Sequence, residues 1–205
     1  MNAFNSDEDI HTNTAAQVFH MPPDFITPEM RRRAKAVNFG IVYGIGAFSL
    51  SQDIGVSVAE ADQYIKNYLD TFSGVRKYME DTVSFAQENG YIATIFGRRR
   101  ALPEITASNK NIVNFGKRVA MNTPIQGTAA DIIKIAMIRV EQALKEQNLE
   151  SRLILQVHDE LLIEAKEDEV EAVKAILERE MKGAANLAVP LEIDMHTGTN
   201  WYEAK

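Results

Sequence analysis

Apolar residues recur along most of this chain at the three-to-four-residue spacing that is typical of amphipathic helices. The clearest helix start is Thr27-Pro28-Glu29. A threonine hydroxyl caps the first turn, proline loses no needed hydrogen bond there, and an acid suits the positive end of the helix dipole. The pattern therefore predicts a helix over residues 28–43, followed by glycine turns and a short segment around 48–54.

Further helices are expected before and after this one. Ser57 and Glu60 have the spacing of a capping box, which predicts that a helix begins at residue 57. The other expected helices cover about 12–19, 74–87, 109–121, 126–146 and 167–182. The break between 121 and 126 is expected because Pro124 interrupts the pattern.

Strand signals are fewer, and the first begins at residue 91. Residues 91–97 are rich in aromatic and β-branched side chains and lead into a turn with Arg98, Arg99 and Arg100. Residues 152–165 read as two apolar strands joined by a tight turn, and 190–198 as a last strand. Helices dominate, with a small and antiparallel sheet, so the predicted fold class is α+β.

Length and composition exclude several classes of protein. The 205 residues are 45% apolar and 25% charged, as in globular proteins, and no apolar run is long enough to cross a membrane. The chain has no cysteine, so disulfides, thiolate metal sites and a cysteine nucleophile are excluded. The first twenty residues are acidic and lack the basic start of a signal peptide, so a cytoplasmic protein is expected.

Basic and acidic residues are unevenly distributed along the chain, so the net charge alone does not describe its surface. The net charge of −7 argues against a nucleic-acid partner. Residues 91–140, however, carry 8 basic and 2 acidic groups, and Arg31, Arg32, Arg33 and Lys35 form a second basic cluster. A phosphate-binding face is therefore compatible with this acidic protein.

The helix predicted over 28–43 carries a candidate ligand site. Arg31, Lys35, Phe39 and Tyr43 recur every fourth residue and form a slowly drifting stripe, cations first and aromatic rings last. This order suits a nucleoside triphosphate, with the cations on the phosphates and the rings against the base. The alternative is a solvated basic end beside an ordinary pair of core aromatics.

A second candidate is the predicted turn at His158-Asp159, which Glu160 follows. Two adjacent carboxylates on a rigid hairpin suit Mg²⁺, which takes a few protein oxygens together with substrate phosphates. The alternative is an ordinary polar turn, because Asp is frequent in turns.

A third group, Arg118, Asn122 and Gln126, is also spaced by four. Such donors and amides suit the edges and phosphates of a nucleic-acid duplex. They are equally compatible with helix caps and surface hydrogen bonds. The basic triplet 98–100 is compatible with phosphate contact or with an ordinary charged turn.

Taken together, these segments resemble one family, the family A DNA polymerases of the bacterial DNA polymerase I type. RRRAKAVNFGIVYG is similar to motif B of that family and QVHDE to motif C. NTPIQGTAADIIKIAM resembles the segment that leads into a long palm helix, DIHTNTA the DIHxxTA element, and GTNWYEAK the C-terminal end. The resemblance is collinear over nearly the whole chain.

The resemblance implies a nucleotide-binding fingers domain over 1–103 and the C-terminal part of the palm over 104–205. It implies a DNA-directed DNA polymerase of replication and repair in the bacterial cytoplasm, at the nucleoid, that transfers a nucleotide from dNTP to a primer 3′-hydroxyl with two Mg²⁺ ions. The implied roles are phosphate binding for Arg31, Lys35 and His11, sugar and base contact for Phe39, template contact for Tyr43, DNA contact for Arg118, Asn122, Gln126 and His158, and metal binding for Asp159 and Glu160, with Asp159, Glu160 and Lys35 as the catalytic residues.

One expected segment of the family, an Asp-Tyr-Ser motif that supplies a second metal-binding carboxylate, is not in these 205 residues. We therefore expect this chain alone to be inactive, and its shortened palm sheet to expose an edge for self-association. Two alternatives remain. The chain is either a non-catalytic DNA- or nucleotide-binding module of the same ancestry, or an unrelated helical DNA-binding regulator for which Asp159 has no role.

Overall fold

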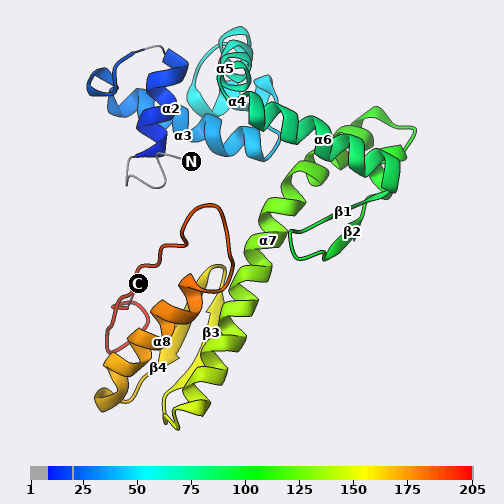
Figure 1. Ribbon diagram of the computed structural model, residues 1–205. Coiled ribbons are helices and arrows are strands. Elements are labelled where there is room, and N and C mark those ends of the chain that lie inside the picture. Colours follow the sequence, from blue (N-terminus) through cyan, green and yellow to red (C-terminus); the bar gives the residue numbers. More distant parts are fainter. Residues whose placement is uncertain (1–8, 20, 205) are drawn as a thin grey trace. The chain divides into compact units, whose positions relative to one another are not determined.

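The computed structural model describes residues 9–19 and 21–204. The chain forms two compact units, one ending at Gly127 and the other beginning at Thr128, within its longest helix (Figure 1). The described residues are mostly helical, with two small antiparallel sheets, which confirms the α+β class. The expected boundary between fingers and palm after residue 103 stays a prediction.

The unit that ends at Gly127 is built mainly from helices. Its elements are α2 (Ile10–Phe19), η1 (Pro23–Phe25), α3 (Pro28–Val42), α4 (Ala47–Ile54), α5 (Val58–Thr71), α6 (Ser73–Asn89), β1 (Tyr91–Ala93), β2 (Arg99–Ala101), η2 (Pro103–Thr106) and the first part of α7 (Lys110–Glu146). The predicted helix starts at Thr27 and Ser57 are confirmed. Thr27 Oγ1 accepts a hydrogen bond from Met30 N at 3.2 Å, and Ser57 and Glu60 form both bonds of the capping box.

Two apolar clusters hold this unit together. The larger one joins α3, α4 and α5 through Val37, Ile41, Leu50, Ile54, Ala61 and Tyr68. The second joins α6, the β1–β2 hairpin, η2 and α7 through Ala86, Ile92, Leu102, Ile105 and Ala120. Burial of these side chains is what fixes one face of α3 inward and leaves its other face open.

The unit that begins at Thr128 packs a hairpin and a helix on the rest of α7. Strands β3 (Arg152–Val157) and β4 (Glu160–Glu164) pair antiparallel, and η3 (Glu167–Glu169) leads into α8 (Val170–Lys182). The core of this unit comprises Val140, Ala143, Leu144, Val173 and Ile176, with Leu161 and Ile163 of β4 packed against it. The predicted hairpin, its turn and the acidic helix are thus confirmed.

The predicted break at Pro124 is wrong. Helix α7 runs through this proline without interruption from Lys110 to Glu146. Proline removes one backbone donor, but buried Ala120 and Met121 anchor the preceding turn in the unit, and the hydroxyl of Tyr78 donates to the carbonyl of Met121 at 3.4 Å. Tertiary packing therefore overrides the local preference.

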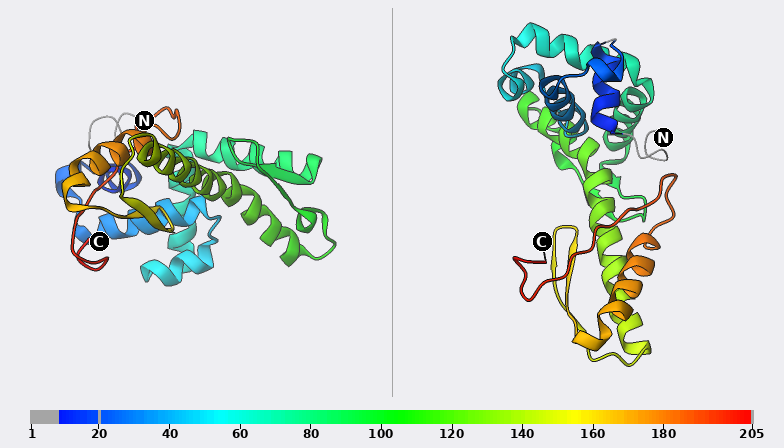
Figure 2. Two further views of the ribbon diagram at one scale, coloured as in Figure 1. Left: turned by 90° about the horizontal axis from the view of Figure 1, so that it is seen from below. Right: turned by 90° about the vertical axis from the view of Figure 1, so that its left-hand side faces the viewer.

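Two strand predictions are also wrong. Arg99 and Arg100 belong to β2 and not to the turn, which Thr94 and Gly97 close through backbone bonds. Residues 190–198 form no strand (Figure 2). Half-buried Leu191 and Ile193 nevertheless alternate with exposed Glu192 and Asp194. Alternation of buried and exposed side chains does not by itself make a strand, because the backbone groups of a strand need a neighbouring strand to pair with.

Within the described ranges, no helix combines the length and the apolar character that a membrane span requires.

Candidate nucleotide and nucleic-acid site

The predicted stripe lies on the exposed side of α3. Arg31 and Lys35 are exposed, and so are the rings of Phe39 and Tyr43, at 49% and 42%. The buried residues of the helix, Ala34, Val37, Gly40 and Ile41, face the other way. The alternative of a core aromatic pair is wrong, because both rings are open to solvent. Two cations and two rings therefore lie at the surface of this helix.

Helix α2 brings His11 to the middle of this stripe. The rings of His11 and Phe39 have centroids 5.7 Å apart and are tilted by 51°. The Nδ2 atom of Asn38 lies 3.0 Å from His11 Nδ1 and donates to Thr14 Oγ1 at 3.2 Å. With Asn38 as the donor to Nδ1, the proton of the neutral imidazole resides on Nε2. His11 is thereby fixed in place as a donor.

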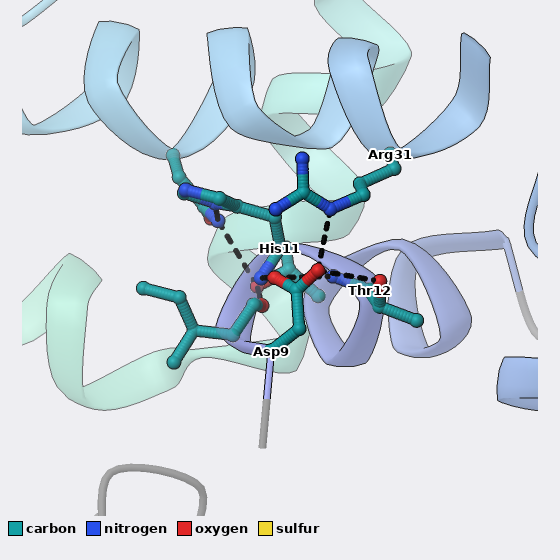
Figure 3. A network of polar contacts seen from close by, with 7 residues as sticks. Asp9, His11, Thr12 and Arg31 are labelled. Atoms are coloured by element: carbon teal, nitrogen blue, oxygen red, sulfur yellow. Dashed lines mark hydrogen bonds and ion pairs between the residues drawn. The ribbon is translucent and has the colours of Figure 1, made fainter. Parts of the chain in front are cut away.

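Asp9 forms an ion pair with Arg31 at the cationic end of the stripe (Figure 3). The same carboxylate accepts from the backbone N–H of His11 at 2.9 Å and from Thr12 Oγ1 at 3.0 Å. The bond from Arg31 is the largest cause that holds the pKa of Asp9 well below its ordinary value, and the same pair raises the pKa of Arg31. Asp9 is thus ionised at neutral pH. It pairs with Arg31, a cation that is predicted to bind phosphate.

His11 is more difficult to protonate than a free histidine. Burial is the main cause that lowers its pKa below 6.5, and the positive charges of Arg31 and Lys35 lower it further, against the opposing effect of Asp9. At neutral pH the ring is therefore neutral. It can donate a hydrogen bond but supplies no full positive charge.

Sequence reasoning missed Asp9 and Asn38. Asp9 stands at the start of the DIHTNTA segment, but nothing in its spacing relates it to Arg31, which lies 22 residues further on. Asn38 had one available signal, because it is a polar residue in the otherwise apolar half of α3. Both act by orienting residues that the sequence did identify.

Arg118, Asn122 and Gln126 form the stripe of α7, and this stripe meets the aromatic end of α3. The side-chain amide of Gln126 donates to the Tyr43 hydroxyl at 2.8 Å. Gly44 has a φ of +70°, and a Cβ atom there would lie 2.7 Å from Met121 Cε and 2.9 Å from Arg118 Cγ. Only glycine allows this close approach. The structure therefore brings together two groups that were predicted separately.

An open hollow of about 580 Å³ lies at this junction. Its lining includes the two stripe rings, the guanidinium-bearing Arg118 and the acid Asp53. Asn122, one turn further along α7, has a buried Oδ1 atom without a hydrogen-bond partner among the described residues. A buried acceptor without a partner is energetically costly.

The β3–β4 hairpin presents its acidic residues to solvent. His158 sits in the turn with a φ of +50°, and Asp159 follows it. Glu160 opens β4 opposite Val157, and all three polar side chains are exposed. The backbone carbonyl of His158 accepts from Gln156 Nε2 at 2.7 Å, which stiffens the turn. The carboxylates are therefore held on a defined scaffold.

These two carboxylates fit magnesium in kind. Mg²⁺ binds through one or two carboxylates and completes its shell with water and substrate phosphates. Within the described residues, no cluster of three or more histidines and acids is placed to hold a metal. The two carboxylates are therefore compatible in kind with Mg²⁺, and a metal site at the hairpin stays a prediction.

The stripe and the hairpin belong to different compact units, one on each side of the Gly127–Thr128 boundary. A cleft shared by Lys35 and Asp159 therefore stays a prediction.

Comparison with known proteins identifies the family. Residues 1–203 match the profile of "DNA polymerase family A". The chain is 53% identical over 203 residues to DNA polymerase I of Bacillus subtilis strain 168, covering 99% of the chain and 23% of that protein. It is 51% identical over 205 residues to DNA polymerase I of Bacillus caldotenax, covering 100% of the chain and 23% of that protein.

A solved structure matches the fold as well. The POL domain of Pol1 from M. smegmatis, in complex with DNA primer-template and dNTP, aligns with a TM-score of 0.93 and 46% identity, over 99% of this chain and 36% of that one. The chain belongs to DNA polymerase family A. It spans about a quarter of the length of the curated relatives that it matches.

Proposed function

We propose that this chain binds deoxynucleoside triphosphate along the exposed stripe of α3. Arg31 and Lys35 would contact the phosphates, His11 would donate to them from Nε2, and Phe39 would contact sugar and base. The observation that carries the proposal is the solvent exposure of both rings in line with both cations. Large apolar rings are left exposed where a ligand covers them.

Primer–template DNA would lie against α7 and the hairpin turn. Tyr43 would meet the templating base, while Arg118, Asn122, Gln126 and His158 would contact the duplex near the primer terminus. The hydrogen bond between Gln126 and Tyr43 supports this assignment, because it puts one predicted DNA contact beside one predicted nucleotide contact. The partner class is also the one bound by the Pol1 domain of M. smegmatis.

The reaction would be in-line attack of a primer 3′-hydroxyl on the α-phosphorus of the nucleotide. Asp159, with Glu160 beside it, would hold Mg²⁺, which when bound activates the attacking oxygen and stabilises the leaving pyrophosphate. Lys35 would neutralise charge on the phosphates, and the other stripe residues would orient the nucleotide. Positioning and charge are the main contributions of this chain.

The 205-residue chain alone would not extend a primer, because Asp159 and Glu160 are too few shared ligands for two neighbouring cations. Primer extension with Mg²⁺ tests this claim, with Lys35→Ala as a control for contaminating polymerase. Incorporation that Lys35→Ala abolishes would contradict inactivity. The alternative of a non-catalytic binding module of the same ancestry predicts no incorporation even after the Asp-Tyr-Ser segment is supplied.

Nucleotide binding is measured directly by titrating a fluorescent dNTP analogue into the chain with Mg²⁺. We expect Lys35→Ala to weaken binding about tenfold, as for loss of a charged hydrogen bond to phosphate. Lys77→Ala is the matched control, because Lys77 is exposed and forms an ion pair with Asp81 of its own helix, away from α3. Equal affinity of both variants would contradict the assignment of α3.

We also propose that the chain acts in the bacterial cytoplasm at the nucleoid, because its relatives are bacterial.

We further propose that the chain associates with itself through β3, because β3 exposes Ile154 and Leu155 at 55% and 40%. Sedimentation velocity should detect dimers that Ile154→Lys disrupts. Ile138→Lys on exposed α7 is the control, and a chain that stays monomeric at every concentration would contradict self-association.

A further inference from the structure

The β1–β2 hairpin has two unlike faces. Its register pairs Tyr91 with Ala101, Ile92 with Arg100 and Ala93 with Arg99. Ile92 is 5% exposed and belongs to the core, so residues at alternate positions, including Tyr91 and Arg99, lie on the opposite, outer face. This outer face is formed by a part of the chain that the nucleotide site does not use.

A row of flat groups covers the outer face. The Arg99 guanidinium carbon lies 4.6 Å from the centroid of the Tyr91 ring. On the same ring, Phe85 of α6 packs edge-on with centroids 5.5 Å apart and planes at 88°. Phe85 is 40% exposed, and at the hairpin tip Phe96 is 45% exposed. The rings are therefore braced by one another while remaining accessible.

The hairpin itself carries charge of one sign, whereas α6 places the exposed acids Asp81 and Glu88 one turn from Phe85. Residues 89–103 include three arginines and no acid, and the nearest acids in the sequence are Glu88 and Glu104. Arg98 is already engaged, because its Nη2 atom donates to the carbonyl of Gly127 at 2.9 Å. Arg99 and Arg100 are exposed and present their charge at the surface. A negatively charged partner is thus favoured over a neutral apolar one.

We propose that the outer face of the β1–β2 hairpin, with Phe85, Tyr91 and Arg99, binds single-stranded nucleic acid. Unpaired bases stack on aromatic and guanidinium planes, and the phosphates pair with arginine, whatever the base sequence. Base stacking needs exposed flat groups, and binding of the phosphate backbone of the nucleic acid needs positive charge. This surface combines the two. A duplex does not expose its base faces and fits less well. The inference shares with the proposed function only the class of partner, a nucleic acid.

The test uses the full chain and a short fluorescein-labelled oligothymidylate, without primer or nucleotide. Fluorescence anisotropy over a range of salt concentrations gives the affinity and its salt dependence. Arg99→Gln should weaken binding at least about fivefold and reduce the logarithmic salt slope by about 0.7, the contribution of one phosphate on a single strand. Phe85→Leu should weaken binding several-fold without changing the slope, because only a stacking surface is lost.

Arg152→Gln is the matched control, since Arg152 is an exposed strand arginine of β3 and the charge change is the same. It should leave affinity and slope at the parent values, and circular dichroism should confirm that each variant is folded. Parent-like binding of both Arg99→Gln and Phe85→Leu would overturn the proposal. Displacement of the oligonucleotide by polyglutamate as well as by unlabelled oligothymidylate would also overturn it, and would indicate an acidic polypeptide instead.

This result is separable from the proposed function. Lys35→Ala should keep its affinity for oligothymidylate while losing affinity for dNTP. Failure of nucleotide binding in the parent chain would therefore leave the hairpin assay interpretable.

Discussion

Gln126 and Tyr43 lie 83 positions apart in the sequence and are joined by a 2.8 Å hydrogen bond between the amide nitrogen and the phenol oxygen. The bond links the stripe of α7 to the stripe of α3. Tyr43 and Arg118 both line the hollow at this junction. Two groups that sequence spacing predicted independently are therefore parts of one surface.

A double-mutant cycle on this bond should give a measurable coupling. Tyr43→Phe and Gln126→Ala each remove one partner, and because both side chains are exposed we expect a coupling of about 0.5 kcal/mol, at the low end for a neutral hydrogen bond. Urea unfolding of the two single variants and the double variant measures it. Strictly additive effects would mean that the bond contributes nothing in solution.

Gly44→Ala should destabilise the chain by about 1–3 kcal/mol, because its φ of +70° is unfavourable for a residue with a Cβ atom and that atom would approach Met121 and Arg118. Gly74→Ala is the contrasting variant, since Gly74 lies in the first turn of α6 with nothing within 4 Å of its added Cβ. Alanine there should be neutral or slightly stabilising. Equal effects of the two substitutions on the free energy of unfolding would argue against the close approach of α3 and α7.

Asp9→Asn should strengthen dNTP binding modestly, by at most about fivefold. Asp9 pairs with Arg31 and adds negative charge where a triphosphate is proposed to bind. Glu29→Gln is the control, because Glu29 pairs with Arg32 and Arg33 of the same helix and not with the stripe. Weaker binding by Asp9→Asn in the fluorescent titration would show that Asp9 organises Arg31 for the phosphates instead of competing with them.

His11 predicts a dependence of stability on pH with a defined sign. Burial lowers its pKa below 6.5, so the unfolded chain takes up the proton more readily than the folded one. Its stabilising contribution is therefore complete above pH 6.5 and is lost as the pH falls through 6.5 toward the folded pKa. Among the described residues, Asp9 is the acid whose charge raises the pKa of His11, and Arg31 and Lys35 are the cations whose charges lower it.

We expect the parent chain to lose more free energy of unfolding than His11→Gln between about pH 7.5 and about pH 5.5. Denaturant titrations at the two pH values give the comparison. An identical loss in both proteins would mean that His11 is solvated in the folded chain.

Much of the fold could be predicted from local signals. Thr27, Ser57 and Glu60 identified their helix starts because capping depends on neighbouring residues only. The β3–β4 hairpin was predicted because two apolar strands flank a polar turn. The stripe of α3 was found because its period is that of the helix.

The errors and omissions have a common physical origin in tertiary contacts. Packing keeps α7 continuous through Pro124, and the lack of a pairing neighbour leaves residues 190–198 without strand bonds, which no local pattern reports. The same holds for Asp9, whose partner Arg31 lies on another helix. Site residues defined by periodicity were accessible to sequence reasoning, and those defined by a distant partner were not.

We propose that Lys35 and Asp159 act on one bound nucleotide. Because the chain has no cysteine, Lys35→Cys with Asp159→Cys supplies the only two thiols, and Lys66→Cys with Asp159→Cys is the control pair. Treatment with a short bis-maleimide in the presence of primer–template DNA, followed by mass spectrometry, measures the intramolecular cross-link. We predict a high yield for the Lys35 pair and a background yield for the Lys66 pair, whereas equal background yields would contradict a joint action of Lys35 and Asp159 on one nucleotide.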